Sequence, residues 1–128
     1  MENGLIGNLD KWCVVDWPQN ARDGYDFDLA EGKVSEGSHN AINAYLYGAM
    51  ERVNRLAKIC GTDVCYDTKP LRDAYIESFY DEKQGLFCDA PTSKHTALAS
   101  NVFALAFGAF ADLSTETTPL PNKKSIPL

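Results

Sequence analysis

Apolar residues are densest between residues 97 and 110, where the run is interrupted only by Ser100, Asn101 and Gly108. A helix that is apolar around its whole circumference is buried in a protein interior. Thr92 or Ser93 can cap such a helix at its start, and Gly108 lies where the pattern ends. The run is shorter than the roughly 20 apolar residues that cross a bilayer. We therefore predict a buried helix over residues 95–110 and no membrane span.

A second helix is predicted over residues 39–60. Ser38 is a suitable N-cap and Gly61 a suitable C-terminal stop. The first half is apolar on nearly every side and is expected to lie deeper than the amphipathic second half. One face carries apolar residues at a spacing of three to four, namely Ile42, Tyr45, Leu46, Ala49, Val53, Leu56, Ala57 and Cys60.

A third helix is predicted to end near Phe79. It begins at Asp63 or restarts at Pro70, which is best tolerated in the first turn of a helix. Its inward residues are expected to be Leu71, Ala74, Tyr75 and Phe79. The turn at Gly61-Thr62 is so short that this helix and the one before it should be antiparallel neighbours.

Residues 80–87 contain Gly85 between aromatic residues and predict a small β-hairpin or a tight loop. Because successive helices alternate in direction, the segments that precede His39 and His95 should lie at the same end of the protein. One of those segments, residues 18–37, is much longer than an ordinary connection, and such long loops are usually either functional or flexible.

The composition excludes several classes of function. The chain has 128 residues, enough for one domain, of which 45% are hydrophobic and 23% charged. Its 12 Lys and Arg against 18 Asp and Glu form no basic stripe, so we expect no nucleic-acid partner. The four cysteines lack metal-binding spacing and are interpreted as ordinary thiols. We expect no metal, no cofactor and no export signal, and the cellular compartment stays open.

Several segments, in their order along the chain, resemble the catalytic domain of bacterial α-L-rhamnosidases, the family-78 glycoside hydrolases. The match covers residues 5–110. The first two segments, a few residues apart, are the more specific ones. The segments are Val15-Asp-Trp-Pro18, Arg22-Asp-Gly-Tyr25, Asn43-Ala44, Phe79-Tyr-Asp81 with Gly85-Leu-Phe87, and His95 to Gly108.

The resemblance implies an all-α fold in which the three helices form part of an (α/α)6 toroid of six helical hairpins. Residues 1–37 would be an irregular loop segment, 38–110 the helical part and 111–128 a tail. The spacing from Tyr66 to Phe79, with Pro70 inside it, departs from the smoother helix that the family leads us to expect.

The resemblance also implies inverting hydrolysis of terminal rhamnosides, which needs a general acid and a general base about 6.5–9.5 Å apart. In the family these carboxylates lie upstream and downstream of the matched segment. No catalytic residue is therefore assigned to this chain, and whether the chain is an enzyme by itself stays open.

Candidate substrate contacts of the parent enzyme lie in the long loop and at the starts of two helices, which share one end of the protein. An indole can stack on a sugar face, and arginine or a carboxylate can bind hydroxyl groups. The alternative is a loop held by an ion pair of Arg22 over a packed tryptophan. The two histidines each begin a helix and bind substrate or help cap it. The candidates are Asp16, Trp17, Arg22, Asp23, Tyr25, His39 and His95.

Three further polar residues are given structural roles. Asn43 is expected to bond a loop carbonyl, because a buried amide must find partners. Ser100 and Asn101 are expected to bond neighbouring helices.

Two functions compete. The favoured one is a fragment of a glycoside hydrolase that takes a rhamnose-containing saccharide in the parent enzyme and is inactive alone. The alternative is a small helical interaction module, and no repeat suggests a helical-repeat scaffold.

Two other helices cannot cover all the large residues of the third, so the isolated chain should self-associate through residues 97–110 or expose an apolar patch. Those residues are Val102, Phe103, Leu105, Phe107 and Phe110.

Overall fold

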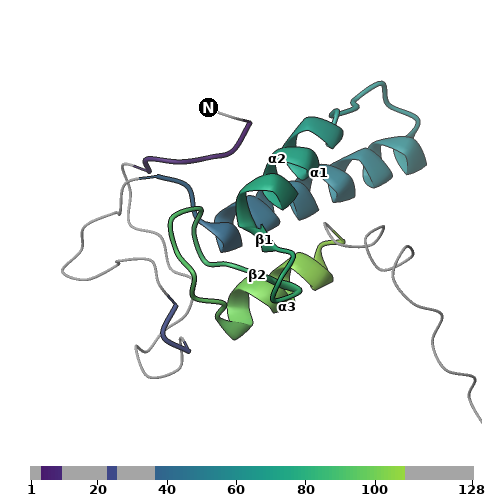
Figure 1. Cartoon of the computed structure of the whole chain (residues 1–128). Coiled ribbons are helices and arrows are strands. Elements are labelled where there is room, and N and C mark those ends of the chain that lie inside the picture. Colours follow the sequence, from purple (N-terminus) through teal and green to yellow (C-terminus); the bar gives the residue numbers. More distant parts are fainter. Residues whose placement is uncertain (1–3, 10–22, 26–36, 109–128) are drawn as a thin grey trace, which may run out of the picture.

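The computed structural model describes residues 4–9, 23–25 and 37–108, and this part of the chain is mostly helical. Figure 1 shows α1 and α2 side by side, with α3 packed below them and a small hairpin between. This confirms the predicted helical class. The described residues do not form a closed ring. The elements are α1 (Asn40–Cys60), α2 (Lys69–Phe79), β1 (Tyr80–Asp81), β2 (Leu86–Phe87) and α3 (Leu98–Ala106).

Helix α1 buries its first half, as predicted, but through a different face. Its buried residues include Ala41, Ala44 and Gly48, whereas Tyr45 and Val53 of the predicted face are exposed. The reason is steric, because small side chains let α2 and α3 approach the axis of α1 closely. A Cβ atom added to Gly48 would overlap the ring carbons of Phe107.

The start of α1 also differs from the prediction. Ser38 is not the N-cap, because it pairs with Gly7 in an isolated β-bridge. His39 occupies the N-cap position and makes no side-chain capping bond. The stop at Gly61 is confirmed: this residue adopts a left-handed φ of 67°, and its N–H donates to carbonyls of the last turn.

Helix α2 agrees with the sequence. Pro70 lies in its first turn, and Leu71, Tyr75 and Phe79 are buried. The connection from α1 is longer than predicted, because residues 63–68 are not helical. The two helices still lie against each other and run in opposite directions (Figure 1).

The predicted hairpin is present. Tyr80 pairs with Phe87 and Asp81 with Leu86, and Gly85 turns the chain with a φ of 67°. The carboxylate of Asp81 accepts backbone N–H groups inside the turn. The hairpin carries one aromatic ring into the main core, whose buried members are Leu5, Ala44, Tyr47, Leu71, Tyr75, Phe79, Phe87 and Ala104.

Helix α3 is shorter than predicted, because it begins at Leu98 and ends at Ala106. Neither Thr92 nor Ser93 caps it, since Ala97 occupies the N-cap position. The hydroxyl of Ser93 instead accepts the N–H of His95 in the preceding turn.

Burial of α3 is one-sided. Ser100 and Ala104 are buried, but Leu98, Val102 and Leu105 are 66%, 45% and 62% exposed. The expected incomplete cover is thus confirmed for Val102 and Leu105, whereas Phe103 of α3 and Phe107 at its C-cap pack partly against the core. Phe110 lies outside the described residues. No helix in the described ranges has the length and apolar character to cross a membrane.

Candidate functional site

The N-terminal ends of α1 and α3 lie together, as the alternation of helices predicted. The N–H of Asn40, at the start of α1, donates to the carbonyl oxygen of Asp89 at 2.9 Å. The N–H of Ala97, at the start of α3, donates to the carboxylate of the same residue at 2.9 Å. One residue of the connecting segment therefore joins both helix ends. We call Asp23, Tyr25, His39, Asp89 and His95 the helix-end cluster.

Asp89 is the centre of the helix-end cluster. Asp89 is fully buried. Its Oδ1 also accepts the hydroxyl of Ser100 at 2.5 Å, and its Oδ2 lies 2.7 Å from Nδ1 of His95. No described buried side-chain oxygen or nitrogen lacks a partner, so this buried carboxylate is fully accommodated.

His95 links the buried carboxylate to the surface. Its side chain is 44% exposed, and its Nδ1 faces Asp89. The backbone reinforces the pair, because the N–H of Asp89 donates to the carbonyl of His95 at 2.9 Å. The ring also lies beside Gly24: a Cβ at that position would be 3.4 Å from Nε2.

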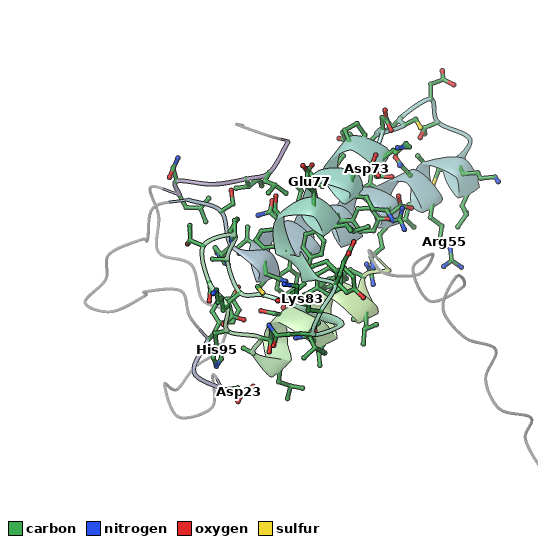
Figure 2. All side chains as sticks on the ribbon, in the orientation of Figure 1. Asp23, Arg55, Asp73, Glu77, Lys83 and His95 are labelled. Carbon is green, nitrogen blue, oxygen red and sulfur yellow. The ribbon has the colours of Figure 1, made fainter. Side chains whose placement is uncertain are left out.

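Asp23 caps α3 from a distant segment. Its Oδ2 accepts the N–H of Leu98 at 2.7 Å, which satisfies one of the free donors at the helix start. Asp23 and Gly24 both have left-handed φ values, of 52° and 62°, and Asp tolerates this region better than most residues. Figure 2 shows Asp23 and His95 close together, away from Arg55 on the second half of α1.

Tyr25 and His39 form the buried side of the cluster. The Tyr25 hydroxyl lies 3.2 Å from Nδ1 of His39 and donates to the carbonyl of Asp89 at 3.3 Å. The same oxygen accepts the N–H of Ala41 at 3.1 Å. Burial lowers the pKa of His39 from 6.5 to about 4, so its imidazole is neutral at pH 7.

The predicted site residues thus have different settings. Asp23 and His95 present exposed surface, whereas Tyr25 and His39 are enclosed by protein atoms and join the helix ends. The remaining candidates, Asp16, Trp17 and Arg22, lie outside the described residues.

Asp89 is not among the site residues that the sequence predicts. Nothing in the local sequence distinguishes this aspartate from the many acidic residues that lie at a surface. Its role arises because the segment after β2 passes between the two helix ends. A buried acid between an aromatic strand and a proline-containing turn is visible only once the neighbours are known.

Asn43 makes the predicted loop contact. Its Nδ2 donates to the carbonyl of Ile6 at 3.0 Å, and its Oδ1 accepts the N–H of the same residue at 2.8 Å. The prediction for Ser100 and Asn101 was wrong, because neither bonds a neighbouring helix. Ser100 bonds Asp89, and Asn101 accepts the N–H of Phe87 in the hairpin at 2.9 Å. The short side chains reach the adjacent loop and strand before any helix.

A second feature is an open hollow of about 400 Å³ between the end of α2, the hairpin and the turn at residues 90–93. Its walls include Tyr80, Asp81, Lys83 and Cys88. Burial is the main cause that raises the pKa of the Cys88 thiol. The described residues contain no group of three or more His, Cys, Asp or Glu side chains placed to hold a metal ion.

No protein-family model matches this sequence, and neither curated proteins nor solved structures show significant similarity to it.

Proposed function

We propose that this chain is part of a six-hairpin glycosidase of the α-L-rhamnosidase type. In this proposal the helix-end cluster faces the saccharide, while the general acid and base belong to other parts of the parent enzyme. The observation that carries the proposal is the meeting of Asp23, Tyr25, His39 and His95 at one end of two helices. The alternation of helix directions predicts that the segments carrying these residues share one end of the protein.

The packing supports the proposal. The antiparallel pair of α1 and α2 corresponds to one hairpin of an (α/α)6 toroid, and α3 to the first helix of the next hairpin. In a ring, each helix has neighbours on both sides. Exposed apolar residues on α1 and α3 are expected where such neighbours are missing, and they include Tyr45, Leu56, Ile59, Leu98, Val102 and Leu105.

The chemistry of the exposed residues suits a neutral sugar. A carboxylate such as that of Asp23 accepts hydroxyl protons, and an imidazole such as that of His95 can accept one as well. A phosphate-bearing ligand is less suited to this chain, because its acidic residues outnumber its basic ones and the basic residues form no stripe along the sequence.

The deciding experiment is to sequence the DNA on both sides of the coding segment. We expect a reading frame, intact or frameshifted, that continues into glycosidase sequence bearing the two missing carboxylates. A stop codon followed by unrelated genes would reject the glycosidase proposal. Turnover of a chromogenic rhamnoside by the chain alone is expected from neither function and therefore does not separate them.

The second candidate is a helical interaction module, and the exposed side of α3 favours it. Leu98, Val102 and Leu105 follow the four-and-three spacing of a helix-packing seam. Such a seam can bind a second apolar helix face. An authentic stop codon combined with concentration-dependent association through this seam would support this function over the first.

A further inference from the structure

We propose that Asp89 is a positioning residue that fixes the His95 imidazole with its proton on Nδ1, so that Nε2 offers a lone pair to a hydroxyl group of a ligand. The identity of the ligand as a rhamnoside rests on the proposed function. The tautomer itself does not, because it follows from contacts within the chain.

The contact between Asp89 and His95 has a defined donor and acceptor. An ionised carboxylate has acceptors only, and a neutral imidazole has one N–H donor and one acceptor nitrogen. Oδ2 of Asp89 lies 2.7 Å from Nδ1 of His95, so the proton of the ring belongs on Nδ1. The other oxygen of Asp89 is already occupied by the N–H of Ala97 and the hydroxyl of Ser100.

Asp89 and His95 are both held by several hydrogen bonds. Asp89 is fully buried and is held by its own N–H and carbonyl oxygen as well as by its carboxylate. His95 is held at its carbonyl by Asp89 and at its N–H by the hydroxyl of Ser93 at 3.0 Å. Side chain and backbone bonds together therefore limit rotation of the imidazole, as required of a group that must meet a ligand in one orientation.

The second ring nitrogen of His95, Nε2, lies on the side away from Asp89. Within the described ranges, Nε2 of His95 makes no hydrogen bond, and the side chain is 44% exposed. Gly24 lies against this edge of the ring without a side chain that would cover it. Asp23, the preceding residue, is held at the start of α3 through Oδ2.

This arrangement points to a neutral ligand with several hydroxyl groups. One hydroxyl can donate to Nε2 of His95 while a neighbouring hydroxyl donates to the carboxylate of Asp23. A sugar ring presents adjacent hydroxyls in this manner. Asp89 itself is buried and acts through the histidine, so it does not touch the ligand.

The tautomer can be measured directly by long-range ¹H–¹⁵N NMR on the chain labelled with ¹⁵N-histidine, at pH 8. We expect His95 to carry its proton on Nδ1. The variant Asp89→Asn should reverse this, because the carboxamide N–H can donate to Nδ1 and then leaves the proton on Nε2. Asp81→Asn, which alters another turn-bonded carboxylate, is the matched control and should leave the tautomer unchanged.

The wild-type spectrum decides the inference even if Asp89→Asn fails to fold. A proton on Nε2 in the wild-type chain, or an even mixture of the two tautomers, would overturn it. An unchanged tautomer in a folded Asp89→Asn variant would also overturn the role of Asp89.

Titration with methyl α-L-rhamnoside tests the ligand. We expect the Nε2 resonance of His95 to shift on addition of the glycoside. The affinity should fall about tenfold in Asp89→Asn, as for the loss of one well-formed hydrogen bond. The expected tautomer without any response to the glycoside would confirm the positioning role and reject the rhamnoside. If His95 carries its proton on Nε2 and its resonance still shifts with the glycoside, the rhamnoside is supported and the positioning role of Asp89 is rejected.

Discussion

The hydroxyl oxygen of Tyr25 accepts the backbone N–H of Ala41, and the two atoms lie 3.1 Å apart. The start of α1 is therefore capped by a residue that lies 16 positions before Ala41, on a separate segment of the chain. An ordinary N-cap bond comes from the residue at the helix start itself. The contact explains why neither Ser38 nor the His39 side chain is needed for this task.

Replacing Tyr25 with phenylalanine should destabilise the chain by about 1–2 kcal/mol, because the change removes a buried cap and leaves the donor of Ala41 unsatisfied. Urea unfolding followed by circular dichroism measures the difference. Tyr66→Phe is the matched control, since Tyr66 is exposed and uses its backbone rather than its hydroxyl to bond Asn54. Equal losses in the two variants would contradict the capping role.

Stability should fall as the pH drops from 6.5 toward 4, because of His39. Burial lowers the pKa of its imidazole to about 4 in the folded chain, whereas the unfolded chain binds the proton near 6.5. Between these values the unfolded state binds more protons, so acid favours unfolding. The contribution is fully present above pH 6.5, and about 2 kcal/mol of it is lost by pH 5.

The measurement is urea unfolding of the wild-type chain and of His39→Gln at pH 7.5 and pH 5.0. The variant lacks the buried imidazole, so its stability should depend less on pH over this interval. His95 is present in both chains and cancels in the comparison. Equal pH dependence in the two chains would show that His39 is not the group responsible.

Gly48→Ala should destabilise the chain although alanine is the better helix former. An alanine Cβ would overlap the ring of Phe107, and relieving such overlap in a packed interface costs about 1–3 kcal/mol. The gain in helix propensity is only about 1 kcal/mol. In a Phe107→Ala background the overlap with the ring disappears. Only the flexible guanidinium end of Arg52, 2.9 Å from the added Cβ, must then move, and Gly48→Ala should become stabilising. A destabilisation that persists in this background would reject the steric explanation.

Asn43→Leu should cost about 2–3 kcal/mol, because Asn43 holds both backbone groups of Ile6 and its loss leaves them unpaired. Asn54→Leu is a matched control, since Asn54 bonds the N–H and carbonyl of Tyr66 in the same manner but at an exposed position. Water can replace that bond, so the cost should stay below about 1 kcal/mol. Thermal unfolding of both variants measures whether Asn43→Leu costs more stability than Asn54→Leu.

The isolated chain should associate through the exposed side of α3. Each large apolar side chain left in water forfeits about 1.5–3 kcal/mol, which a partner surface can recover. Sedimentation equilibrium should show concentration-dependent association that is lost in the double variant Leu98→Gln with Leu105→Gln. Leu56→Gln, at an exposed position of α1, is the control. A monomeric wild-type chain that binds no hydrophobic dye would contradict this prediction.

Local sequence determined the elements of this protein. Pro70 placed the start of α2, and Gly61 and Gly85 marked turns, because the backbone geometry of these residues is a property of the residue itself. The spacing of Leu71, Tyr75 and Phe79 was sufficient to identify a buried face, since the opposite side of α2 is polar.

Only the tertiary structure decided the buried face of α1, the caps and the centre of the helix-end cluster. The first half of α1 is apolar on nearly every side, so periodicity could not choose among its faces, and close approach at Ala41, Ala44 and Gly48 made the choice. Tyr25 and Asp89 both bond the start of α1, which lies far from each of them in sequence. Such contacts depend on which segments fold against one another, and no local pattern encodes that.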